Sequence, residues 1–139
     1  DAHRQYIWGF VLDASLQAPF FGHGIDTSNF FPGASVLIQK FNQSFVPSHP
    51  HNWLLEIFSE TGAFGLFTLL IALSCLLSAW LKIARISPGT GACGITLFFT
   101  FWSSSMLNFS IWAAWWQTVF LILTVIVLAS GFRAFATKQ

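Results

Sequence analysis

Apolar and polar positions divide this chain of 139 residues into a mixed first part and a second part that is almost without charge. Thr61–Leu81 contains no charged residue, and about 20 residues of helix cross a hydrocarbon core of about 30 Å. Ile86–Phe132 is free of charge over 47 residues, and one straight helix of that length would be about 70 Å long. That segment therefore predicts two spans with a turn between them, near residues 90–107 and 111–131. The pattern predicts three transmembrane helices within residues 61–139.

Residues 1–60 predict a loop region with short amphipathic helices. Apolar positions recur with helical spacing over His3–Gln17, which predicts a helix that Pro19 ends. Four Gly and Pro residues in Phe20–Gly33 are typical of a structured loop. Ala34–Pro47 mixes apolar and polar residues, and it fits either a short helix or an irregular loop that lies on the membrane.

The stretch His49–Gly65 stands where the two parts of the chain meet. Helical spacing of apolar residues predicts a short helix over Trp53–Thr61. Asn52 is its expected N-cap, because an asparagine oxygen can accept a free backbone N–H of the first turn. Gly62 can end this helix just before the first predicted span. A polar group would thus be held at a membrane surface.

The composition agrees with a membrane protein. Hydrophobic residues make up 55% of the chain and charged residues only 8%, against about 25% charged in soluble proteins. The 17 Phe and 7 Trp suit contact with membrane lipids and their interfaces. No cluster of basic residues can neutralise a nucleic-acid backbone, which excludes that class of partner. Cys75 and Cys93 lie in apolar stretches, where an inert small side chain is more common than a disulfide or metal ligand.

The basic residues beside the spans predict an orientation. Lys82 and Arg85 follow the first span, and Arg133 and Lys138 follow the third, which returns to the same side. Basic residues favour the cytoplasmic side of a membrane. We therefore predict a cytoplasmic C-terminus and, for residues 1–60, a position on the outer face, which in a bacterium is the periplasm.

Two side chains of the first part could carry chemistry. A histidine accepts protons near neutral pH, and the positive end of a helix dipole disfavours its charged form, so His51 is a candidate base. An arginine grips a phosphate through two hydrogen bonds, which makes Arg4 a candidate anion ligand. Both residues also have ordinary interpretations. His51 could simply cap a helix at the surface, and Arg4 could lay its stem along apolar surface.

A metal site is the alternative chemistry. His49 and His51 form an HxH pair, to which His23, Asp26 or Glu56 could add ligands. Such a site would fit a membrane transport or metal-binding protein. The predicted spans argue against transport, because a transport path usually has ionisable groups within the membrane. A structural membrane anchor without chemistry is a third possibility.

The central stretch resembles the conserved core of the O-antigen ligase and O-antigen polymerase superfamily of bacterial membrane glycosyltransferases. That pattern is His, then Asn, Ser or Gln, nine residues, Gly, two residues and Gly. His51 and Asn52, followed by nine residues, Gly62, two residues and Gly65, fit it without a gap. The upstream run HRQYIW, which contains Arg4, and the run PFFGHGIDTSNF are similar to the Arg, Trp and Gly-x-Gly positions ahead of the family's histidine.

The resemblance implies a multi-spanning, all-α glycosyltransferase of the bacterial inner membrane that needs neither a metal nor another cofactor. It would move a glycan from undecaprenyl diphosphate at the periplasmic face, in lipopolysaccharide or surface polysaccharide biosynthesis. The acceptor is lipid A-core for a ligase, another carrier-linked glycan for a polymerase, or a protein for an oligosaccharyltransferase. Three spans rarely make such an enzyme. We therefore expect further spans upstream, with this chain as the carboxy-terminal part of a larger protein.

The resemblance also implies residue roles. His51 would activate the acceptor hydroxyl as the base, and Arg4 would hold the diphosphate leaving group. Substrate binding and the helix break would fall to residues around them, namely Arg4, His49 and Asn52 for binding and Gly62 and Gly65 for the break.

Overall fold

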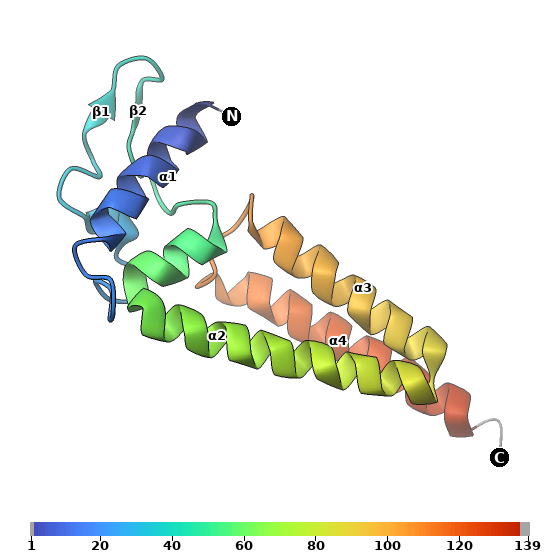
Figure 1. The fold of residues 1–139 in the computed structure, drawn as a ribbon. Coiled ribbons are helices and arrows are strands. Elements are labelled where there is room, and N and C mark those ends of the chain that lie inside the picture. The colour runs from blue at the N-terminus through green and yellow to red at the C-terminus, as the bar shows by residue number, and fades with distance from the viewer. Residues whose placement is uncertain (1, 137–139) are drawn as a thin grey trace. The chain divides into compact units, whose positions relative to one another are not determined.

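A computed structural model describes residues 2–136 of the protein, with side chains described through Gly131 (Figure 1). In chain order its elements are α1 (Ala2–Ser15), the 3-10 helix η1 (Ser28–Phe30), β1 (Leu37–Ile38), β2 (Gln43–Ser44), α2 (Trp53–Ile86), α3 (Pro88–Ser105) and α4 (Ala114–Ala136). The predicted helical class is therefore confirmed, with one very short hairpin added.

The chain forms two compact units. The loop unit comprises the described residues through Leu69 together with Ser105–Trp112. The helical unit comprises Leu70–Ser104 and the described residues from Ala113 onward. The turn between α3 and α4 thus belongs with the first part of the chain, although the sequence places it between two predicted spans.

Helix α1 supplies the core of the loop unit. The helix predicted over His3–Gln17 is present, although it ends at Ser15, ahead of Pro19. Ile7 and Val11, one turn apart, are buried, and they pack against three buried residues from the following segments, Phe31, Ala34 and Val46. Burial of one side of α1 leaves its other side open to solvent.

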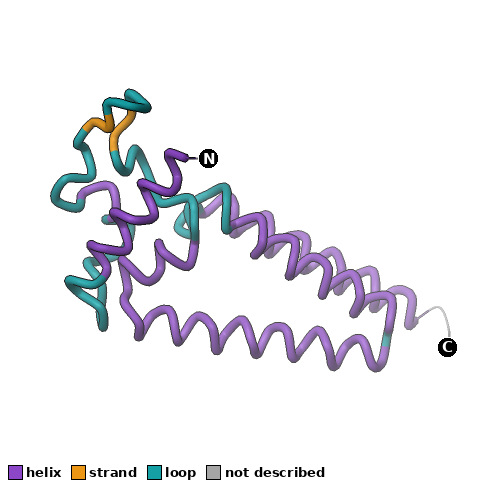
Figure 2. Tube along the Cα trace, turned by 45° about the horizontal axis from the view of Figure 1, so that its top comes forward, coloured by secondary structure: helices purple, strands orange, loops and turns teal. Residues whose placement is uncertain are grey.

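Ala34–Pro47 is neither of the two forms expected for it. Its middle forms an antiparallel hairpin, drawn in orange in Figure 2, in which Leu37 lies opposite Ser44. The ends of the hairpin are tied by a bond from Val46 N to Ala34 O of 3.0 Å. Because both of these residues are buried against α1, packing at the base of the hairpin decides its conformation.

Gly62 interrupts α2. Its backbone angles, φ 68° and ψ −170°, are far from helical values and lie in a region that is essentially restricted to glycine. The helix predicted over Trp53–Thr61 is present, and the break predicted at Gly62 is confirmed.

Residues 19–24 satisfy the backbone groups that this kink releases. A straight helix would bond Ala63 N to Ser59 O and Phe64 N to Glu60 O. Here all four groups bond to the loop instead: Ala63 N to Pro19 O (2.8 Å), Phe64 N to Phe20 O (3.2 Å), His23 N to Ser59 O (3.1 Å) and Gly24 N to Glu60 O (2.9 Å). Since buried backbone groups need partners, the loop and the kink stabilise each other.

Aromatic side chains hold the helical unit together. Phe101 of α3 stacks on Trp116 and Phe120 of α4, with ring centroids 4.7 and 4.5 Å apart. Gly94 of α3 lies against the Trp80 ring of α2, and a Cβ at this glycine would overlap that ring. The second half of α2, α3 and α4 therefore pack as a small helical bundle.

By length and composition, two helices in the described part of the chain can cross a membrane, α2 and the Ala114–Gly131 part of α4. The span predicted near residues 90–107 is helical as α3, which has 18 residues, as many as Ala114–Gly131, but is less apolar than the other two. Of the basic residues used for the orientation, the Arg133 side chain and Lys138 lie outside the part that the structure describes.

Candidate active site

Asn52 begins α2 as its N-cap, as predicted. Its Oδ1 accepts the backbone N–H groups of Leu54 at 3.1 Å and Leu55 at 3.3 Å. The preceding residue, His51, has a positive φ of 53°, a left-handed conformation that turns its side chain out of the helix direction. Pro50 is anchored in turn, because Trp8 Nε1 of α1 donates to its carbonyl oxygen at 3.0 Å.

The two histidines of the HxH pair meet at one carbonyl oxygen. His51 Nδ1 lies 2.7 Å and His49 Nε2 lies 3.1 Å from Asn108 O, and the ring centroids are 4.1 Å apart. A carbonyl oxygen only accepts, so both nitrogens carry a proton. A neutral His51 then keeps its lone pair on Nε2, and no described residue bonds to that nitrogen.

Both ring nitrogens of His49 form hydrogen bonds. With the proton on Nε2, its Nδ1 accepts the Ser48 hydroxyl at 3.1 Å. Burial lowers the pKa of His49, and the neighbouring His51 acts in the same direction, against the opposing effect of the Asn108 carbonyl. His49 therefore favours the neutral form and acts as a hydrogen-bonding partner, which leaves His51 as the available base.

Arg4 lies on α1, four residues before Trp8. Residues four apart share one side of a helix, about 6 Å apart along its axis. Because Trp8 donates to Pro50, that side of α1 is the side at which the segment ahead of α2 lies. Arg4 is partly buried there.

Two glutamates that the sequence analysis did not recognise as a pair complete the site. Glu56 and Glu60 are 0% and 1% exposed, although none of their hydrogen-bond partners among the described residues is a basic side chain. Glu56 Oε1 accepts the Ser110 hydroxyl at 2.5 Å, and its Oε2 accepts Ile111 N at 2.9 Å. Glu56 thus fixes the turn that carries Asn108. It also explains why α4 begins at Ala114 rather than near Ile111.

Glu60 ties two further segments to α2. Its Oε2 accepts Asp26 N at 2.6 Å and Trp112 Nε1 at 2.5 Å, and its Oε1 accepts Ser28 N at 3.1 Å. The two carboxylates therefore join the loop at residues 26–28 to the turn at residues 108–112. Their spacing of four residues is visible in the sequence, but the same spacing is typical of the polar edge of an amphipathic helix.

The two glutamates should respond differently to the same substitution. Every partner of Glu60 is an N–H donor, so Glu60→Gln sets an amide NH₂ against one of them. Glu56→Gln can accept Ile111 N and donate to the Ser110 hydroxyl, which is also an acceptor. We expect Glu60→Gln to lower the free energy of unfolding by about 1–3 kcal/mol and Glu56→Gln by less than about 1 kcal/mol.

Thermal unfolding of both variants in nanodiscs, followed by intrinsic fluorescence, measures this difference. Equal losses in the two variants would contradict the assignment of donors and acceptors around the carboxylates.

The other predicted residues lie elsewhere. His23 does not join the histidine pair, because its Nε2 donates to Ala14 O at 2.9 Å and its ring contacts Phe31. Within the described residues, no group of three or more His, Cys, Asp and Glu side chains is placed to hold a metal ion. Gly65 lies beyond the kink, where a Cβ would overlap the Thr61 side chain. Gly62 and Gly65 are therefore structural neighbours of the site.

The model of a family described as O-antigen ligase matches residues 1–70, about half of the chain. The chain belongs to the O-antigen ligase family. The matched residues contain Arg4, the histidine pair and both glycines of the motif.

Rickettsial relatives agree with this membership. Proteins of Rickettsia conorii, Rickettsia prowazekii and Rickettsia felis, each named as a candidate polysaccharide ligase, are 32% identical to the chain over 120 residues. The alignments cover 83% of this chain and 28%, 29% and 28% of these relatives. The chain thus spans less than a third of the length of these rickettsial relatives. No solved structure matches it significantly.

Proposed function

We propose that the protein is a membrane glycosyltransferase of surface polysaccharide biosynthesis. It transfers a glycan from undecaprenyl diphosphate to lipid A-core or a similar acceptor at the periplasmic face of the inner membrane. The observation that carries this proposal is the state of His51. Its Nδ1 is fixed on Asn108 O, and its Nε2 is left with a lone pair. Membership of the O-antigen ligase family and the names of the relatives support the substrate class.

In this proposal His51 is the base and Arg4 binds the leaving group. The acceptor hydroxyl gives its proton to His51 Nε2, and its oxygen forms a bond to the anomeric carbon of the donor. The bond from that carbon to the diphosphate oxygen breaks, and its electron pair leaves with the diphosphate. Arg4 offsets the charge that develops there. Asn52 and His49 hold His51 in place and line the substrate side, and the proposed reaction uses no metal or cofactor.

The kink in α2 supports the membrane arrangement that we propose. From Ala63 to Ile86, α2 has 24 residues beyond Gly62, a length of about 36 Å that crosses a hydrocarbon core of about 30 Å. We propose that α3 and α4 cross as well. Lys82 and Arg85 then mark the cytoplasmic side. The loop unit lies at the periplasmic surface, where a lipid-anchored donor can reach His51.

Acceptor identity separates the ligase from a polymerase of the same superfamily. The test uses full-length protein in nanodiscs, a carrier-linked glycan donor, and either lipid A-core or a second donor molecule as acceptor. Glycan-capped lipid A-core is the expected product, and Arg4→Gln is expected to lower kcat/KM about tenfold or more, the loss of a charged hydrogen-bonding group.

The products decide between the readings. Extension of one donor by another without capping would make the protein a polymerase. If the folded wild-type protein yields neither product, the proposed function is overturned.

A further inference from the structure

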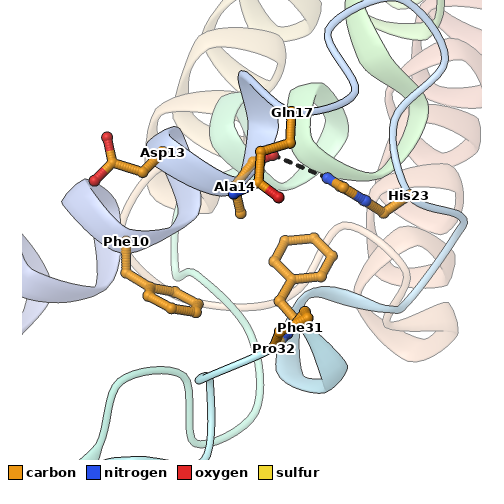
Figure 3. Close-up of a pocket in the computed structure, with 7 residues that line it drawn as sticks. All are labelled: Phe10, Asp13, Ala14, Gln17, His23, Phe31 and Pro32. Carbon is orange, nitrogen blue, oxygen red and sulfur yellow. Dashed lines mark hydrogen bonds between the residues drawn. The ribbon is translucent and has the colours of Figure 1, made fainter.

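Two neighbouring hollows run along the exposed side of α1. The first, shown in Figure 3, is a pocket of about 110 Å³ between the end of α1 and the segment before the hairpin. The second is an open depression of about 450 Å³ on the middle of the helix. They share Phe10 and Asp13. We call them together the α1 groove, whose defining residues are Tyr6, Gly9, Phe10, Asp13, Gln17 and His23.

The spacing of these residues makes the groove continuous. Tyr6, Phe10 and Asp13 follow one another at four and three residues on one side of α1, and Gln17 follows in the turn after the helix ends at Ser15. Gly9 provides its floor. A Cβ at Gly9 would meet nothing within 4 Å. No neighbouring residue therefore fills the space next to this glycine.

The lining combines aromatic rings with hydrogen-bonding groups. The rings of Phe10 and Phe31 border the pocket from two sides, and the Gln17 side chain reaches the same space (Figure 3). Since His23 Nε2 donates to the Ala14 carbonyl, its Nδ1 is an acceptor. Asp13 adds an acceptor at the point where the two hollows meet.

This lining suits a neutral carbohydrate. A sugar ring has a C–H face that packs on the negative face of an aromatic ring, and hydroxyls that both donate and accept. Among the described residues that line the two hollows there is no Lys or Arg, and Asp13 repels an anion. Phosphate and other acidic ligands are therefore disfavoured.

We propose that the α1 groove binds the carbohydrate chain of the substrate, away from the reacting sugar. This inference rests on the proposed function, which requires a polysaccharide, and it adds a place for the chain to lie. One side of α1 carries Arg4 and Trp8, and Trp8 bonds to Pro50 between the two histidines, while the other side carries Tyr6 and Asp13 along the groove. A long donor glycan would be held by the groove, but a single repeat unit would not reach it.

Gly9 gives the sharpest test, because it lines the second hollow and a Cβ added there meets nothing within 4 Å. Full-length Gly9→Ala and Gly9→Leu are compared with wild type in nanodiscs, with donors that carry one repeat unit or many. We expect KM for the long donor to rise severalfold in Gly9→Ala and about tenfold in Gly9→Leu, where tenfold corresponds to about 1.4 kcal/mol. KM for the single-repeat donor should change less than about twofold on the same scale.

Gly89→Ala is the matched control, since Gly89 also has nothing within 4 Å of a Cβ but lies on α3. It should leave both KM values unchanged. Equal KM values of wild type and Gly9→Leu for the long donor would overturn the proposal.

The groove and the proposed function can fail separately. If wild type transfers no glycan, binding to the groove is measured by equilibrium dialysis. Free oligosaccharide released from the native polysaccharide is dialysed against the same nanodiscs. Binding that Gly9→Leu weakens supports the groove, whereas no binding, or equal binding by both proteins, overturns it.

Discussion

His51→Asn is expected to lower kcat for glycan transfer by roughly 10²–10⁴-fold, the usual contribution of a positioned general base. Asparagine is the informative replacement for two reasons. It tolerates the left-handed backbone that His51 adopts at φ 53°. It also places an N–H donor where His51 Nδ1 now bonds to Asn108 O. The variant thus keeps the fold and the hydrogen bond and loses only the basic nitrogen.

His49→Gln serves as the comparison for this prediction. Its amide nitrogen takes the position of His49 Nε2 and can still donate to Asn108 O. We expect a loss of less than about tenfold, because one neutral hydrogen bond contributes about 1 kcal/mol. Initial rates in nanodiscs, with unfolding temperatures checked for each variant, provide the measurement. Wild-type activity in His51→Asn, or an equal loss in His49→Gln, would remove His51 from the role of base.

Features that depend on near neighbours were readable from the sequence. Asn52 caps α2 through N–H groups two and three residues away, and Gly62 supplies a backbone conformation that other residues avoid. The apolar periodicity of His3–Gln17 predicted the helix α1. A cap and the backbone preference of a glycine both act within one turn of the residue itself, so a sequence can reveal them.

The remainder of the site depends on contacts between distant segments. Glu56 meets Ser110 and Ile111 more than 50 residues away along the chain, so its burial could not be inferred from its own helix. Asn108 falls in the turn predicted between two spans. Its backbone carbonyl oxygen nevertheless orients both histidines. Because every residue has a backbone carbonyl, the sequence does not show which one accepts a particular hydrogen bond. The geometry of His51 could therefore be found only from a structure.

Gly62→Ala is expected to lower the free energy of unfolding by about 4 kcal/mol or more, a size found only for severe disruptions. The angles of Gly62 alone cost another residue about 1–3 kcal/mol. In addition, a Cβ at this position would overlap the carbonyl of Phe20 and lie 2.5 Å from Phe21 N. The loop would have to move away. Each of the four backbone hydrogen bonds between residues 19–24 and the kink that is then lost costs about 0.5–1.5 kcal/mol.

Gly22 and Gly89 make this prediction specific. A Cβ at Gly22 would overlap the backbone of Glu60 from the other side of the same contact, so Gly22→Ala should be about as damaging as Gly62→Ala. Gly89→Ala meets no neighbouring atom and should stay within about 1 kcal/mol of wild type. Thermal unfolding of the three variants in nanodiscs tests the order. If Gly62→Ala were as stable as Gly89→Ala, the close approach of the loop to the kink would be wrong. The placement of Glu60, which bonds to Gly24, Asp26 and Ser28, would then fail with it.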